Sequence, residues 1–121
     1  MLKKTISYTD FDGNERKEDF YFNLTKAEAV EMELSANGGL TKALTKIVME
    51  LDSKKIVESF KDLILRSYGE KSLDGKRLIK NQELRDNFSQ TEAYSELFME
   101  LSGNAEAASD FINGIIPNSI K

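Results

Sequence analysis

One short segment carries side chains of the kind that bind a metal ion. Residues 10–14, DFDGN, place acidic and amide side chains around Gly13, an arrangement typical of the start of a calcium-binding loop. Such a loop needs its glycine at the sixth position and a bidentate glutamate at the twelfth. Counted from Asp10, those positions hold Glu15 and Tyr21. The spacing therefore favours a hairpin turn over a calcium site.

Acidic side chains recur at helical spacing in two other segments, and paired carboxylates are one means of general acid–base catalysis. Catalytic carboxylates need burial or a close charged partner to shift their pKa. The sequence gives neither, and the spacing places the second set along one solvated stripe of a helix. The two sets are Glu28, Glu31 and Glu33, and Glu92, Glu96 and Glu100.

The residues that support most other site chemistry are missing from the sequence. The chain has no histidine, the commonest general base and metal ligand, and no cysteine for disulfides or thiolate metal sites. It also has no Gly-x-Ser-x-Gly elbow, and Gly38-Gly39 is not followed by the rest of a phosphate-binding loop. We therefore expect a non-enzymatic protein with no catalytic residue, metal or cofactor.

The composition is that of one ordinary folded domain. At 121 residues, 40% of them hydrophobic and 31% charged, the chain can bury one core without disulfide or metal support. Its net charge of −4 comes from 17 basic and 21 acidic residues that are interspersed, so we expect no basic surface for nucleic acid. No apolar stretch has signal-peptide or membrane-spanning length, so we expect a cytoplasmic protein with no membrane partner.

Two segments with period-two alternation predict an antiparallel β-hairpin over residues 1–24. Apolar and polar side chains alternate from Leu2 to Tyr8 and again from Phe20 to Leu24, which is typical of strands with one buried face. Between them, residues 12–14 form a strong turn sequence, because glycine and asparagine tolerate positive φ. An isolated hairpin is marginal in water, so we expect its apolar face to lie on helices.

The stretch Asp52–Gly69 is predicted to form the central helix of the core. Asp52 or Ser53 can cap its start, and Gly69 follows the last periodic residue, where helices often stop in a left-handed turn. A wide apolar stripe indicates that this helix crosses the middle of the core. The stripe consists of Ile56, Val57, Phe60, Leu63, Ile64 and Tyr68.

Two helices are predicted before the central one. Thr25 and Glu28 have the spacing of a capping box, and residues 37–39 end the helix that this box begins. A second helical stripe follows, with Thr41 as a candidate cap. The apolar positions of the two helices are Ala27, Val30 and Leu34, and Leu40, Leu44, Ile47, Val48 and Leu51.

Residues 69–82 are predicted to form an excursion with a turn at Asp74-Gly75 and at most a minor hairpin. Asn81 or Asn87 is expected to start short helical turns around Leu84 and Phe88. Amphipathic helices follow over Thr91–Leu101 and Ala105–Gly114. Their apolar positions are Tyr94, Leu97, Phe98 and Leu101, and Ala105, Ala108, Phe111, Ile112 and Ile115.

The predicted fold class is α+β and mostly α. One domain is expected over residues 1–121, with an N-terminal antiparallel β-hairpin at 1–24, four to five helices within 25–116, and a tail at 117–121. The C-terminal segment is strongly apolar for the end of a small chain, and a last helix docked on the core explains this first. The alternative is a helix that packs into a partner or another subunit.

Four sequence blocks, in their order along the chain, resemble the tail assembly chaperones of long-tailed, siphovirus-type bacteriophages and prophages of Gram-positive bacteria. The resemblance covers nearly the whole chain, and it depends on the order of the blocks because no single motif is specific. The blocks are Asp19–Glu28, Tyr68–Ser72 with Asp74–Arg77, Gln90–Phe98, and Phe111–Pro117.

The resemblance implies a binding role and no reaction. Such proteins bind the long, helical, apolar tape measure protein before the tail tube polymerises around it, keep it soluble, and leave the finished virion. It thus implies the tape measure protein as partner, self-association, and the host cytoplasm as location. An apolar groove or self-associating surface would suit this role. The residues expected to contact the partner, most of which must also build the core, are Tyr94, Leu97, Phe98, Phe111, Ile112, Ile115 and Ile116.

Two other functions remain as alternatives. A small structural virion protein, such as a tail or head–tail completion component, would use a similar α+β domain but stay in the particle. A small enzyme or nucleic-acid regulator is disfavoured, because the chain lacks histidine and cysteine and has no basic face.

Overall fold

The computed structural model describes residues 1–31 and 54–116, with side chains for residues 1–29 and 60–116. It confirms the predicted α+β class with an N-terminal antiparallel hairpin. The strands are β1 (Leu2–Thr9), β2 (Glu15–Phe22), β3 (Tyr68–Lys71) and β4 (Leu78–Ile79). The helices are α1 (Lys26–Glu31), α3 (Lys54–Ser67), α4 (Gln82–Ser89), α5 (Glu92–Ser102) and α6 (Ala105–Ile115).

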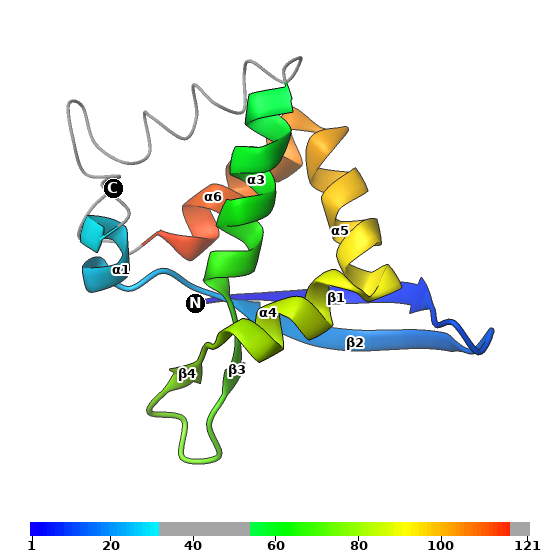
Figure 1. Cartoon of the computed structure of the whole chain (residues 1–121), viewed down its shortest axis with the longest axis horizontal. Coiled ribbons are helices and arrows are strands. Elements are labelled where there is room, and N and C mark those ends of the chain that lie inside the picture. The colour runs from blue at the N-terminus through cyan, green and yellow to red at the C-terminus, as the bar shows by residue number, and fades with distance from the viewer. Residues whose placement is uncertain (32–53, 117–121) are drawn as a thin grey trace.

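The described strands form one antiparallel sheet in the order β1-β2-β3-β4. β1 pairs with β2 along its whole length, whereas β2 pairs with β3 only at Tyr21 and Phe22. The outer part of the β1–β2 hairpin therefore projects beyond the other strands, as Figure 1 shows. β3 and β4 form a second hairpin that extends the sheet, so residues 69–82 contribute more to the fold than the predicted minor hairpin.

The turn of the first hairpin uses the side chains that had suggested a metal loop. Gly13 has a φ of +84°, and the Asp10 carboxylate accepts hydrogen bonds from the backbone N–H groups of Asp12 (3.0 Å) and Asn14 (2.9 Å). Arg16 Nε donates to the same carboxylate at 2.6 Å, and this bond and the two backbone donors hold the pKa of Asp10 below its usual range. The predicted turn is confirmed. Among the described residues, no group of three potential ligands is placed to hold a metal ion.

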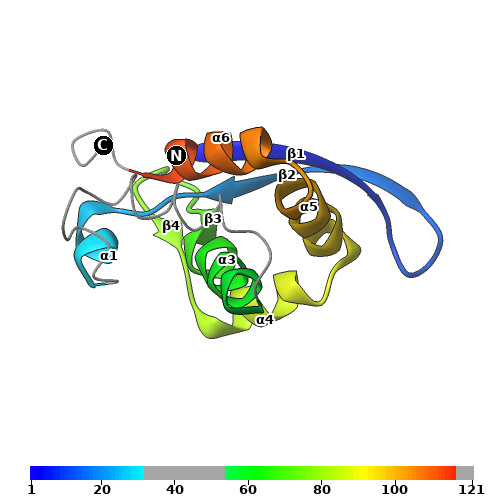
Figure 2. The same cartoon turned by 90° about the horizontal axis from the view of Figure 1, so that it is seen from above.

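The apolar face of the hairpin is covered by helices, as the alternation predicts. Figures 1 and 2 show α3, α5 and α6 on one side of β1 and β2, with α6 lying along β1. Phe22 of β2 is fully buried, and its ring lies 5.2 Å from that of Phe111 and 5.8 Å from that of Phe88. Tyr68 stacks on Phe88 with their ring centroids 4.2 Å apart. These aromatic rings join β2, β3, α4 and α6 in one core.

The central helix α3 has the predicted buried face where side chains are described. Phe60, Leu63 and Ile64 are buried, whereas the predicted caps at positions 52 and 53 and the side chains of positions 56 and 57 lie outside the described part. The chain passes from Ser67 directly into β3, so Tyr68 is buried on a strand instead of the helix.

The predicted left-handed stop at Gly69 is wrong. Gly69 lies in β3 opposite Tyr21, and the described glycines with positive φ are Gly13 and Gly75. Position 69 requires glycine because β4 lies very close to the backbone there. A Cβ there would lie 2.7 Å from Leu78 Cγ and 2.8 Å from the Ile79 carbonyl oxygen.

Helix α1 begins with the predicted capping box. The backbone N–H of Thr25 donates to the Glu28 carboxylate at 3.0 Å, and the Glu28 N–H donates to the Thr25 hydroxyl at 3.1 Å. Its buried face is shifted from the prediction, because Ala27 is exposed and Ala29 is fully buried. The predicted positions 30 and 34, the stripe through 40–51 and the tail at 117–121 fall outside the described side chains.

The last three helices start at side chains that cap them. Asn81, Thr91 and Asn104 each accept hydrogen bonds from backbone N–H groups of the first turn of α4, α5 and α6. The bounds of α5 and α6 agree with the predicted helices to within one residue. Ala105 was predicted on the buried face of α6, but it is exposed because it is the first helical residue and extends beyond the core.

Replacement of Gly69 by alanine is expected to destabilise the protein by about 1–3 kcal/mol, because the new methyl group meets the backbone of β4 as well as a side chain. Urea unfolding measures the change. Gly75→Asn is the matched control in the same hairpin: Gly75 has a φ of +74° and open space around it, and asparagine tolerates that conformation. Equal losses in the two variants would contradict the close-approach explanation.

Candidate protein-binding site

A hollow of about 400 Å³ beside α5 contains the exposed part of the predicted partner-binding set. Four parts of the chain line it: the first turns of α5, the junction between α4 and α5, one aromatic ring from the hairpin turn, and one lysine of α3. We call it the α5 groove. Its lining residues are Phe11, Lys61, Ser89, Gln90, Thr91, Glu92, Tyr94, Ser95 and Phe98.

The aromatic residues of the α5 groove are held in place from below. Tyr94 and Phe98 are four residues apart on α5, so they lie on one face of the helix, and both are half-buried. The ring of Tyr94 packs edge-on against Phe88 of the core at 5.7 Å and lies 6.0 Å from that of Phe98. Burial raises the pKa of Tyr94. The groove thus has fixed aromatic walls.

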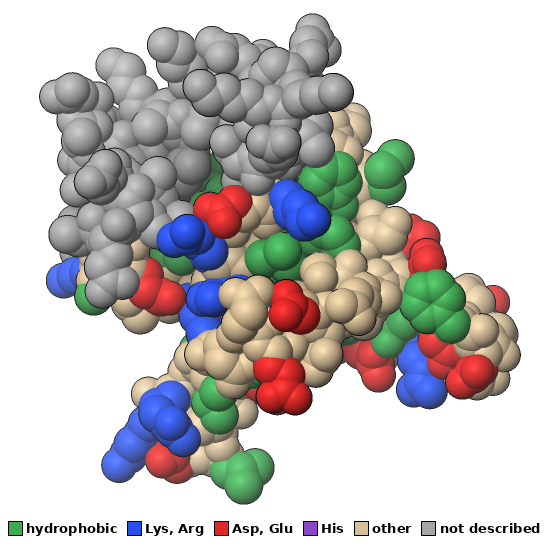
Figure 3. Space-filling model, in the orientation of Figure 1, with side chains coloured by type: hydrophobic (Ala, Val, Ile, Leu, Met, Phe, Trp, Pro, Cys, Tyr) green, Lys and Arg blue, Asp and Glu red, His purple; other side chains and the backbone are tan. Residues whose placement is uncertain are grey.

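Phe11 supplies a large apolar surface at the edge of this groove. Its side chain is 78% exposed at the hairpin turn, and covering an aromatic side chain of this size is worth about 1.5–3 kcal/mol. Met99, which directly follows Phe98 on α5, is 65% exposed. Figure 3 shows hydrophobic side chains at the surface over α5 and on the outer hairpin. An apolar helix in the groove would cover side chains that water now surrounds.

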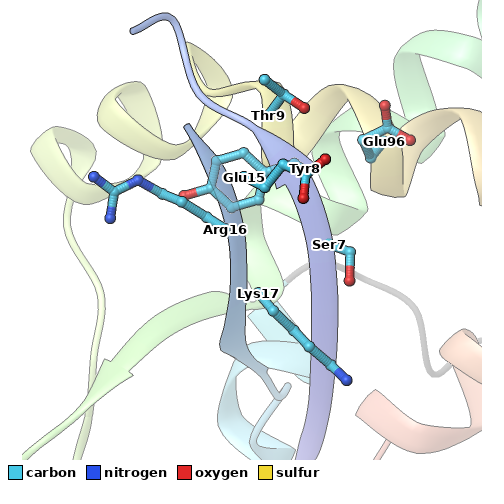
Figure 4. Close-up of a pocket in the computed structure, with 7 residues that line it drawn as sticks. All are labelled: Ser7, Tyr8, Thr9, Glu15, Arg16, Lys17 and Glu96. Atoms are coloured by element: carbon cyan, nitrogen blue, oxygen red, sulfur yellow. The ribbon is translucent and has the colours of Figure 1, made fainter. Parts of the chain in front are cut away.

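A second hollow, of about 570 Å³, is polar and lies along the outer half of the hairpin. Its lining residues are Ser7, Tyr8, Thr9, Glu15, Arg16, Lys17 and Glu96, which Figure 4 shows. Arg16 pairs with Asp10, and the Tyr8 hydroxyl donates to Glu18, a bond that raises the pKa of Tyr8. The hydrogen-bonding groups of Tyr8 and Arg16 therefore serve the hairpin itself.

The best-enclosed ion pair of the described residues joins Lys80 to Glu28. The Lys80 Nζ donates to both carboxylate oxygens at 2.8 and 2.7 Å, and also to the Asn23 carbonyl. Burial raises the pKa of Glu28, but the bonds from Lys80 and Thr25 outweigh it, so the net shift is downward. Burial lowers the pKa of Lys80, and Glu28 only partly offsets this. The pair ties the start of α1 to the segment after β4, which is a structural role.

The structure divides the seven predicted partner-binding residues into two groups. Tyr94 and Phe98 reach the α5 groove. The other five are between 0% and 4% exposed and belong to the core, which includes Leu97, Phe111, Ile112, Ile115 and Ile116. The docked interpretation of the C-terminal helix agrees with this burial.

Apart from Met1, three exposed large apolar side chains were missed by the sequence reasoning: Phe11, Leu73 and Met99. Phe11 and Leu73 each stand beside an Asp-Gly turn, and an apolar residue next to a turn signal was the available clue. Met99 follows Phe98 on α5, but it lies outside the periodic apolar positions that predict the buried face of this helix.

A family model described as "Phage tail assembly chaperone" matches residues 1–121 of the chain. No curated protein and no solved structure matches it. Among the described residues, no helix combines the length and the apolar character that a bilayer span requires.

Replacement of Glu28 by glutamine is expected to lower the free energy of unfolding at neutral pH by roughly 1–3 kcal/mol, because Lys80 would keep its charge in a buried place without a counter-charge. The folded-state pKa of Glu28 is below its ordinary value, so its contribution is present above the ordinary value and lost as the pH falls through the folded pKa. The difference between wild type and variant should therefore shrink in acid.

Urea unfolding at a series of pH values measures this difference. Glu83→Gln is the control, because Glu83 is exposed on α4 and makes no ion pair with a described residue. A Glu28→Gln variant as stable as the control at neutral pH would show that the pair contributes nothing to the fold.

Proposed function

The chain belongs to the phage tail assembly chaperone family, and we propose that it binds the tape measure protein and keeps it soluble during tail assembly. The family is non-enzymatic. The observation that carries the proposal is the α5 groove, where aromatic side chains from two separate elements stand exposed or half-exposed around one hollow. We assign direct client contact to Tyr94, Phe98 and Phe11.

The shape and chemistry of the groove suit one helix of the client. A helix presents apolar side chains at steps of three and four residues, and a groove with aromatic walls can take two or three of them. Lys61 and Glu92 give the lining of the groove one charge of each sign, which suits the polar residues of an amphipathic helix. Tyr94 and Phe98 pack against the core cluster that contains the other five residues of the predicted set.

The acidic character of the chain supports the solubilising part of the role. The net charge is −4 with both signs interspersed, so a complex in which apolar client segments are covered would still present a charged exterior. We further propose that the protein acts in the cytoplasm of its bacterial host, serves a siphovirus-type phage or prophage of a Gram-positive host, and is absent from the mature virion.

Co-expression with the tape measure protein of the same gene cluster tests the proposal. We expect the tape measure protein to be insoluble when expressed alone, and soluble and co-eluting in size-exclusion chromatography when this chain is present. If neither protein affected the solubility or elution of the other, the chaperone role would be wrong. Recovery of this chain from purified virions would favour the structural virion protein instead.

Phe11→Ser tests the groove itself. We expect this variant to fold like wild type, because the side chain is exposed, and to recover less soluble tape measure protein than wild type does. Leu73→Ser is the matched control, since Leu73 is likewise an exposed apolar residue at a hairpin turn but does not line the groove. Equal recovery with both variants would remove Phe11 from the binding site.

A further inference from the structure

Within residues 1–31 and 54–116, no strand pairs with the outer edge of the eight-residue strand β1. β1 is the first strand in the order of the sheet, and β2 is its one neighbour among the described strands. Figure 4 shows Ser7 and Glu96 on the side of β1 away from β2, next to the polar hollow. The backbone edge of β1 is thus open to solvent along this hollow.

The register shows which backbone groups this edge presents. The Asn23 N–H donates to the Ser67 carbonyl at 2.8 Å, so the backbone groups of Tyr21, two residues earlier, also point toward β3. Lys3 lies opposite Tyr21 in the β1–β2 ladder. Along a strand, the N–H and C=O groups of successive residues point alternately to its two sides, so residues with the same orientation recur at every second position. The N–H and C=O groups of Lys3, Thr5, Ser7 and Thr9 therefore point outward. At the turn, the Asp10 N–H bonds to the Asn14 carbonyl, which agrees with this phase.

The two free edges of the hairpin differ in their protection against pairing. Residues 15–19 of β2, beyond the point where β3 leaves, read ERKED and are all charged, a common way of keeping an edge unpaired. β1 reads LKKTISYT, with two adjacent lysines near one end, no acidic residue and no proline, and its register with β2 is continuous without a bulge. β1 is the edge that remains competent for pairing.

We propose that β1 pairs antiparallel with β1 of a second copy of this chain, with the two-fold axis at Ile6. This register places Lys3 opposite Thr9 and Thr5 opposite Ser7, so no like charges face each other across the pair. The result is one sheet that runs through both copies, with isologous contacts that close at the dimer.

The charge pattern on the helix-covered face favours this register. In it, Lys4 of the second copy lies opposite Tyr8 of the first. Glu96 of α5 is exposed beside Tyr8 in the polar hollow, and it forms no ion pair with a described residue. Within its own chain, Lys4 pairs with Glu100 of α5 at 3.1 Å. In the dimer, the Lys4 of the second copy would therefore meet Glu96 of the first as a further acidic neighbour, one helical turn from Glu100. The inference does not depend on the client, because the β1 edge and the α5 groove are lined by different residues.

Ser7→Pro tests the dimer on the full chain. The Ser7 N–H points outward, so proline removes a bond to the second copy without removing one to β2. Lys17→Pro is the matched control, since Lys17 lies opposite Ser7 on the other free edge and also points outward. Light scattering after size exclusion should give twice the 13.7 kDa chain mass for wild type and Lys17→Pro, and the single mass for Ser7→Pro. A monomeric wild type, or a dimeric Ser7→Pro that remains folded by circular dichroism, overturns the proposal.

Cysteine cross-linking tests the register independently of proline. The natural chain has no cysteine, and opposed residues in an antiparallel pair have Cα atoms within disulfide range, at about 5.5 Å. An oxidised mixture of Thr5→Cys and Ser7→Cys should give a covalent dimer, whereas Thr5→Cys alone should give none. A covalent dimer from Thr5→Cys alone to the same extent would contradict a two-fold axis at Ile6.

Discussion

The fold depends on one aromatic cluster in which Phe22 is completely enclosed. Rings from β3, α4 and α6 surround it, at centroid distances of 5.2 to 5.8 Å. Since these rings come from distant parts of the chain, the cluster fixes the angle at which the helices meet the sheet. The direct connection from α3 to β3 follows from the same packing, because Tyr68 stacks on Phe88 while the backbone of the next residue, Gly69, lies close to β4.

This cluster explains why few apolar residues are left for a partner. A small domain must commit most of its large apolar side chains to its core, and here the C-terminal helix contributes Phe111, Ile112 and Ile115 to it. Exposed aromatic surface in such a domain is therefore informative. Tyr94 and Phe98 lie at the border between the two uses, because their helix packs on the core through Leu97 and Leu101.

Much of the fold could be predicted from local patterns, because those patterns have local causes. Alternation predicts the first hairpin, capping side chains predict where α1 and α4 begin, and apolar periodicity predicts α5 and α6. The role of Gly69 could not be predicted, since its reason is the approach of β4, which is a tertiary contact. The same holds for the extension of the sheet by β3 and β4. For the site, spacing predicts Tyr94 and Phe98, but the placement of Phe11 beside them depends on how the hairpin lies against α5.

Hydrogen–deuterium exchange of this chain, with and without bound tape measure protein, tests the central claim most directly. If the client lies in the α5 groove, exchange slows around Phe11 and over residues 89–98, and it stays unchanged at the Asp74-Gly75 turn. Protection that appears only at the turn between β3 and β4, with the groove unchanged, would show that the client binds elsewhere and would contradict the account.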